Sequence, residues 1–178
     1  MLKLYCGRPE DASARSDVEI SVYDMLDSIG VPYGRLDHEP AFTMEICAEI
    51  DKSLGAVICK NLFLTNRQKT DFYLLMMPSR KVFKTKELSK ALGVSRLSFG
   101  DADTMESLMK TLPGSASVMG LMNDKEGKVR LVIDKDVLSE EYVGCHPCVN
   151  TSSLKIKTSD LTNKILPYLN RSYTVVEL

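Results

Sequence analysis

The sequence has no tryptophan, only two histidines and almost no net charge. Its 23 lysines and arginines nearly balance its 24 aspartates and glutamates, which leaves a formal charge of -1 at pH 7. This balance excludes a uniformly basic nucleic-acid binder. Any contact with nucleic acid therefore has to come from a small local patch.

Several signatures of common enzyme classes are missing too. The chain contains no P-loop, no Rossmann glycine fingerprint, no Gly-x-Ser-x-Gly elbow and no His-Glu-x-x-His helix. These absences argue against a P-loop nucleotide hydrolase, a dinucleotide-dependent dehydrogenase, an α/β-hydrolase and a zinc protease of the usual kinds.

Long apolar runs are also absent. No stretch approaches the roughly 18 apolar residues that span a bilayer, and residues 1–6 are too short an apolar segment for a signal peptide. Five cysteines, an odd number, occur in a chain without a secretion signal, which favours reduced thiols over a disulfide framework. We therefore expect a cytoplasmic protein without a membrane partner.

The sequence does have the composition of an ordinary globular protein, with 44% hydrophobic and 26% charged residues among 178. Apolar periodicity and turn residues predict helices near 16–29, 43–50, 85–92, 103–112 and 160–169. They predict strands near 33–38, 56–64, 72–77, 96–99, 116–122, 128–134, 142–146, 154–157 and 173–176. This pattern predicts an α/β (α+β) fold in one domain, residues 1–178, built on a mixed, largely antiparallel sheet of about seven strands or more with flanking helices.

The most unusual local feature is the run Cys145-His146-Pro147-Cys148. A Cys-x-x-Cys pair suggests thiol redox chemistry, but that chemistry needs a helix to begin at the motif, and no amphipathic helix follows Cys148. Zinc is a second interpretation, although the run supplies three ligands where a structural site needs four. A third interpretation is that both cysteines only fill space beside a proline turn.

Lys60 and Asn61 stand at the centre of an otherwise apolar strand, residues 56–64. Strand alternation could simply direct Lys60 to solvent. Alternatively, Lys60 is a cation held in a pocket to meet a phosphate or another electron-rich group, because a buried ammonium needs a partner or a cleft.

Two further segments have the composition of ligand-binding loops. In Pro113-Gly114-Ser115-Ala116, small residues allow a backbone to approach a ligand and to offer N–H donors to a carbonyl. Around His146, a rigid turn carries several hydrogen-bonding side chains at the end of a strand. Its neighbours in this interpretation are Gly144, Pro147, Asn150 and Thr151.

Taken together and in this order, the three segments resemble the prolyl-tRNA editing domain family. This is the partly barrel-like fold of the insertion domain of bacterial prolyl-tRNA synthetases and of its free-standing relatives. The matching segments are Lys60-Asn61-Leu62-Phe63-Leu64, Pro113-Gly114-Ser115 and Gly144-x-His146-Pro147-x-x-Asn150-Thr151. The resemblance covers about residues 16–170, and the last segment is most similar to the free-standing alanyl-tRNA(Pro) deacylases.

The resemblance implies a trans-editing hydrolase that cleaves the ester of a mischarged tRNA(Pro), with alanine as the expected amino acid. It implies no metal and no cofactor, and an attacking water positioned with help from the substrate's own ribose hydroxyl. Lys60, His146 and Gly114 are the implied catalytic residues. The implied substrate-binding residues are Asn61, Ser115, Ala116, Gly144, Pro147, Asn150 and Thr151.

The expected partner is the acceptor end of tRNA(Pro), and prolyl-tRNA synthetase is a candidate second partner. One position departs from the family, whose loop commonly reads Gly-x-x-x-Pro, since Val118 stands where that proline is expected. This departure leaves open a non-catalytic module of the same fold that binds an amino acid or a nucleotide.

Overall fold

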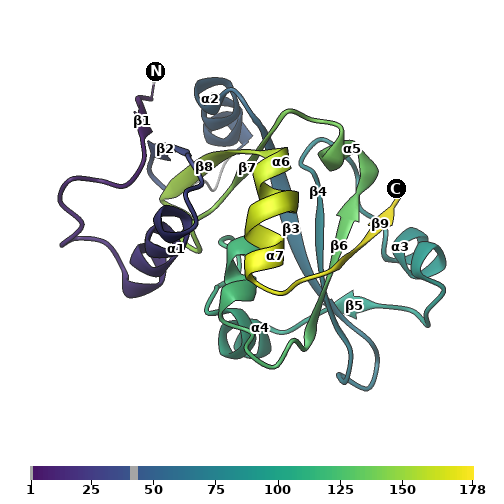
Figure 1. Cartoon of the computed structure of the whole chain (residues 1–178). Coiled ribbons are helices and arrows are strands. Elements are labelled where there is room, and N and C mark those ends of the chain that lie inside the picture. Colours follow the sequence, from purple (N-terminus) through teal and green to yellow (C-terminus); the bar gives the residue numbers. More distant parts are fainter. Residues whose placement is uncertain (1, 41–43) are drawn as a thin grey trace.

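A computed structural model describes residues 2–40 and 44–178, and its strands form a mixed sheet (Figure 1). The strands are β1 (Leu4–Cys6), β2 (Gly34–Asp37), β3 (Val57–Thr65), β4 (Phe72–Pro78), β5 (Ser98–Phe99), β6 (Val129–Asp134), β7 (Tyr142–Cys145), β8 (Ser152–Lys157) and β9 (Tyr173–Val176). Their order is β1-β2-β8-β7-β3-β4-β6-β9, with β5 pairing beside β3. Five of the eight pairings are antiparallel, which confirms the predicted mixed, largely antiparallel sheet.

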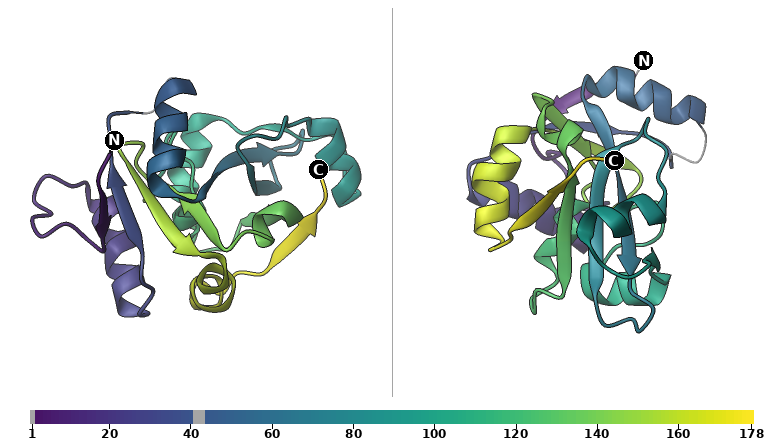
Figure 2. Two further views of the ribbon diagram at one scale, coloured as in Figure 1. Left: turned by 90° about the horizontal axis from the view of Figure 1, so that it is seen from above. Right: turned by 90° about the vertical axis from the view of Figure 1, so that its right-hand side faces the viewer.

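Helices cover both faces of this sheet. They are α1 (Asp17–Ser28), α2 (Met44–Leu54), α3 (Thr85–Leu92), α4 (Ala102–Met109), α5 (Lys135–Leu138), and the C-terminal segment made of α6 (Thr158–Asp160), the π-helical turn η2 (Leu161–Ile165) and α7 (Leu166–Tyr168). Figure 2 shows α1 and the C-terminal segment on one face and α2 on the other. The predicted start of α2 at Thr43 lies outside the described residues.

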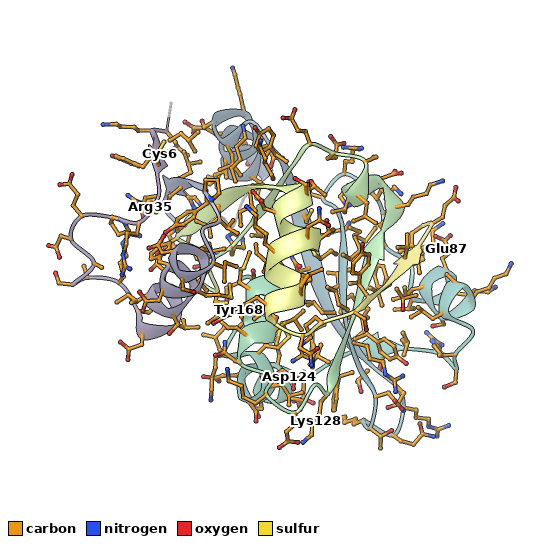
Figure 3. All side chains as sticks on the ribbon, viewed as in Figure 1. Cys6, Arg35, Glu87, Asp124, Lys128 and Tyr168 are labelled. Carbon is orange, nitrogen blue, oxygen red and sulfur yellow. The ribbon has the colours of Figure 1, made fainter. Side chains whose placement is uncertain are left out.

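Different helices pack near the two opposite ends of the sheet. Cys6 and Arg35 mark the β1–β2 end, and Glu87 on α3 marks the opposite end (Figure 3). The largest apolar cluster packs α1, the C-terminal segment and α4 against the sheet between them. No helix in the described part of the chain is long and apolar enough to cross a bilayer.

The strand predicted at 116–122 is wrong. Residues Val118–Met122 instead form a 3-10 helix, η1. Ser117 caps its N-terminus, where the Ser117 side chain accepts a hydrogen bond from the Met119 amide. The segment is apolar and almost fully buried, and periodicity cannot distinguish a buried strand from a buried helical turn. The glycine at position 120 allows η1 to pack directly against the end of α4. A Cβ at Gly120 would lie 3.0 Å from the Met109 carbonyl oxygen.

A charged network fixes α1 against β2 just before His38. Arg15 donates two hydrogen bonds to Asp37, at 3.0 and 2.8 Å, and a third to Glu19 at 3.0 Å. Burial raises the pKa of Asp37, but hydrogen bonds from Arg15 and the charge of Arg35 outweigh it, so the pKa is lowered overall. The ionised network therefore holds the end of β2, from which His38 emerges.

The parallel pair of β3 and β7 joins the two halves of the sheet. Its register is short, Val57 with Val143 and Ile58 with Gly144. A Cβ on Gly144 would lie 2.9 Å from side-chain atoms of both Ile58 and Leu54, and 3.1 Å from the Ile58 Cα. Only glycine allows α2 and β3 to approach β7 this closely.

We predict that Gly144→Ala destabilises the protein by about 1–3 kcal/mol, because the added methyl group overpacks a site bounded by backbone. Gly34→Ala is the matched control, since Gly34 also pairs with Lys155 and a Cβ there meets mainly the flexible Leu4 side chain at 3.2 Å. It should stay within about 0.5 kcal/mol of wild type. Urea unfolding measures both, and equal effects would contradict the close packing at Gly144.

Candidate active site

A cavity of about 350 Å³ opens where β3 and β7 separate. The pairing ends at Gly144, β7 ends at Cys145, and β3 continues alongside β4. The carboxyl ends of parallel strands are the usual place for a ligand crevice in a mixed sheet. The lining comes from α2 (Cys47, Ile50, Asp51), from β3 (residues 58–62), and from Ser79, Gly114, Ala116, His146 and Ser153.

Strand β3 supplies a cation and an amide to this cavity. Lys60 is half-buried, and its Nζ donates a hydrogen bond to the backbone carbonyl of Lys81. Burial lowers the pKa of Lys60. Asn61 donates from Nδ2 to the Cys59 carbonyl at 3.2 Å, while its Oδ1 is buried without a hydrogen-bond partner among the described residues. The Lys60 ammonium thus contacts a neutral carbonyl, and the Asn61 Oδ1 has no hydrogen-bond partner among the described residues.

The loop before η1 approaches the cavity through its smallest residues. Gly114 and Ala116 line it, and Gly114 has φ +89, a conformation that favours glycine. The Ser115 hydroxyl is used inside the turn, where it donates to the Leu112 carbonyl at 3.0 Å and accepts from the Leu112 amide. Ser117 then ties the loop to the His146 segment by donating to the His146 carbonyl at 2.5 Å.

His146 is oriented by a backbone carbonyl. Its Nδ1 lies 2.9 Å from the Ser152 carbonyl oxygen, which can only accept, so Nδ1 carries the proton. Burial lowers the pKa of His146, and the nearby His38 lowers it further. The ring is therefore neutral at pH 7, and Nε2 is a hydrogen-bond acceptor.

The structure brings five of the ten predicted site residues to this one cavity: Lys60, Asn61, Gly114, Ala116 and His146. The other five do not line it. Ser115 closes the turn, Gly144 permits close packing, and Pro147 is buried. Asn150 lies against Gly114, its Nδ2 4.0 Å from where a Gly114 Cβ would be, and the Thr151 carbonyl accepts from the His38 amide.

Sequence reasoning missed three polar residues of the lining, Asp51, Ser79 and Ser153. Burial raises the pKa of Asp51, partly offset by a hydrogen bond from the Ile58 backbone. Ser153 is 1% exposed and its hydroxyl lies 2.9 Å from His38 Nε2. No local signal could have found this pair, because 115 positions separate its members in the sequence.

The structure does not favour the thiol interpretations of Cys145 and Cys148. Both side chains are buried, and burial raises the pKa of the Cys148 thiol to about 12 and that of Cys145 as well. A redox-active or metal-binding thiol needs the opposite shift. Within residues 2–40 and 44–178, no group of three or more His, Cys, Asp or Glu side chains is arranged to hold a metal ion.

Val118 occupies a position where proline is not required. It is the first residue of η1, and the N–H of a first helical residue has no partner within the helix, which is why proline is common there. Val118 is fully buried, and Ser117 already anchors the loop at both ends. The loop is therefore held by packing and hydrogen bonds where the family commonly has a proline ring.

Comparison with known proteins identifies the family. Residues 38–164 match the model of the aminoacyl-tRNA editing domain. The chain belongs to the aminoacyl-tRNA editing domain family. The matched residues include the whole cavity lining, and the expectation of an aminoacyl-tRNA hydrolase is confirmed at the level of this family.

Several known proteins are similar to this editing domain. The chain is 28% identical to the prolyl-tRNA editing protein ProX of Acetoanaerobium sticklandii over 162 residues, which cover 91% of this chain and 98% of that protein. It is 30% identical to prolyl-tRNA synthetase associated domain-containing protein 1 of Xenopus laevis, over 66% of this chain and 72% of that protein. A crystal structure provisionally described as a trans-editing enzyme for prolyl tRNA synthetase has the same fold, with a TM-score of 0.68, 12% identity, and coverage of 93% and 99% of the two chains.

The lowered pKa of His146 predicts a pH dependence of stability. Below about pH 6.5 the unfolded chain protonates this histidine while the folded protein still excludes the proton, so the free energy of unfolding falls as pH falls. The slope is at most about 1.4 kcal/mol per pH unit. This loss of stability stops where the pH reaches the lowered pKa that His146 has in the folded protein.

The variant His146→Asn tests this dependence, because an asparagine Nδ2 can still donate to the Ser152 carbonyl but does not titrate. Urea unfolding at pH 7.5 and 5.5 should show a smaller loss of stability in the variant than in wild type. Equal losses would contradict a buried neutral imidazole.

Proposed function

We propose that residues 1–178 form a single editing domain that acts in the cytoplasm as a trans-editing deacylase of mischarged tRNA(Pro), with alanyl-tRNA(Pro) as its main substrate. The observation that carries the proposal is the convergence of Lys60, Asn61, Gly114 and His146 on one cavity. Similarity to ProX, a prolyl-tRNA editing protein, supports tRNA(Pro) as the carrier of the amino acid.

In this proposal, hydrolysis adds water to the ester carbonyl and breaks the bond to the 3′ oxygen of the terminal adenosine. The products are a free amino acid and a tRNA with a free 3′ hydroxyl. When the substrate binds, the Lys60 ammonium leaves the neutral carbonyl of Lys81 and contacts the electron-rich terminal nucleotide. The Gly114 loop meets the ester carbonyl, where backbone N–H groups stabilise developing negative charge.

Neutral His146 lies beside the aminoacyl group and offers Nε2 as an acceptor. The water attacks with help from the ribose hydroxyl of the substrate, so the protein needs positioning groups rather than a nucleophile of its own. The raised pKa of Cys59, to about 12, agrees with this, because the one cysteine on β3 beside Lys60 stays a thiol.

The lining of the cavity supports an amino acid with a small apolar side chain. At about 350 Å³ the cavity is near the lower end for ligand pockets. The apolar side chains of Ile50 on α2 and Ile58 on β3 belong to this lining and suit contact with a methyl group. Proline would be excluded by volume, because one or two methylenes give only ~1–3 kcal/mol of attractive discrimination.

Recognition of the tRNA body is proposed to be weak. With a net charge of -1, the chain neutralises few phosphates. The acceptor end then supplies most of the contact, and prolyl-tRNA synthetase is the proposed partner that delivers or retains the mischarged tRNA.

We predict that Lys60→Ala lowers kcat/KM for alanyl-tRNA(Pro) by about 100-fold or more, since it removes the only cationic side chain of the described cavity lining. Lys86→Ala is the control, an exposed lysine next to Glu87 on α3, at the far end of the sheet (Figure 3). Loss of the radiolabelled ester measures both, and equal rates would contradict the role of Lys60.

A panel of alanyl-, cysteinyl-, seryl- and prolyl-tRNA(Pro) tests the substrate assignment. Alanine should be removed fastest and proline should be spared. If folded protein deacylates none of these tRNAs, the proposed function is wrong. Thermal stabilisation by alanine or adenosine without ester hydrolysis would instead favour the binding module of the same fold.

A further inference from the structure

Lys81 makes two separate sets of contacts, which join the rim of the cavity to the end of β6. Its backbone carbonyl accepts the hydrogen bond from Lys60 Nζ. Its own ammonium lies 2.8 and 3.0 Å from the carboxylate oxygens of Asp134, 2.9 Å from Asp136 and 2.7 Å from the main-chain oxygen of Leu178. The residue that holds the Lys60 ammonium is therefore itself held from the other side.

The carboxylate that pairs with Lys81 is fully buried. Asp134 ends β6, its side chain has no exposed surface, and its Oδ1 also accepts from the Asp136 amide at 2.9 Å at the start of α5. A buried carboxylate is costly unless it is paired, and Lys81 supplies the opposite charge. Because desolvation offsets much of the attraction, such a pair is weak evidence for stability, and a role in fixing geometry is the alternative.

The loop after β4 turns only the middle one of three consecutive side chains inward. The side chains of Arg80 and Val82 are largely exposed, whereas that of Lys81 is 21% exposed. The loop starts at the cavity, since Ser79 belongs to the lining and its amide donates to the Ile58 carbonyl at 3.2 Å. The place of the Lys81 carbonyl beside Lys60 therefore depends on the inward side chain of Lys81.

We propose that Lys81 is a positioning residue, whose ion pair with Asp134 fixes the backbone carbonyl that presents the Lys60 ammonium to the cavity. This inference rests on the proposed deacylase function, which gives Lys60 its role, and Lys81 acts only through Lys60. A neutral carbonyl orders the long Lys60 side chain before the substrate arrives. It then yields the ammonium to an electron-rich nucleotide, because charge-assisted contacts are the stronger ones.

The variant Lys81→Met tests this role, because it removes the ammonium and keeps most of the length of the side chain. We expect kcat/KM for alanyl-tRNA(Pro) to fall about 10-fold or more, since a small displacement of a positioned group can cost about 100-fold. Lys81→Arg keeps the charge that pairs with Asp134 and should recover most of the lost rate. Lys135→Met is the matched control, since it removes the same charge from the residue after Asp134, where Lys135 pairs with Glu177.

A double-mutant cycle with Lys60→Ala separates positioning from a general structural effect. If Lys81 acts through Lys60, Lys81→Met costs little further once residue 60 is alanine, whereas a purely structural role makes the two losses multiply. The variant Lys81→Met/Asp134→Asn enters the same cycle, because asparagine still caps α5 and leaves no unpaired buried charge. Urea unfolding establishes that each variant is folded.

Chemical labelling of Lys60 gives a readout that does not depend on turnover. In reductive methylation followed by peptide mass spectrometry, Lys60 should react severalfold faster in Lys81→Met than in wild type, because its ammonium loses the fixed acceptor. Lys155, another half-buried lysine, should keep its wild-type rate in the same sample.

The outcomes separate this inference from the function on which it rests. A wild-type kcat/KM in Lys81→Met, losses that multiply in the cycle, or unchanged labelling of Lys60 would each overturn the positioning role while the deacylase stands. Failure of the wild type to hydrolyse alanyl-tRNA(Pro) overturns the proposed function and this inference together.

Discussion

The short parallel contact between β3 and β7 is the constraint on which the rest of this structure depends. Gly144 lets Ile58 and Leu54 lie directly against the β7 backbone, and this joins the half of the sheet under α2 to the half under α3. Because the pairing ends at Gly144 and β7 itself ends one residue later, the strands separate and leave the cavity between them. The candidate site is thus a consequence of where a strand pairing stops.

The groups around this cavity are held by backbone carbonyls and by charges farther out. The Lys81 carbonyl accepts from Lys60, and the Lys81 ammonium is itself fixed by Asp134 at 2.8 Å and Asp136 at 2.9 Å. On the other side, the ion pair of Arg15 with Asp37 fixes the end of β2, just before His38. Such outer contacts preorganise a site whose proposed chemistry relies on position rather than on a reactive side chain.

Sequence reasoning found the segments of the site but not all of its members. Lys60 was detectable because a charged residue interrupts an apolar strand, and His146 because of its rigid turn. Ser153 was not, since an ordinary serine in an alternating strand becomes significant only when folding brings His38 beside it. The strand predicted at 116–122 failed for a related reason, because the packing of Gly120 on Met109 is a tertiary contact.

A crystal structure with 3′-deoxy-3′-(L-alanylamino)adenosine, an amide analogue that resists hydrolysis, tests the central claim most directly. We predict that the alanyl group lies in the cavity beyond Gly144, with its carbonyl near Gly114 and the adenosine toward Lys60. A bound analogue that leaves this cavity empty and occupies another hollow, such as the one between Leu4 and Lys157, would contradict it.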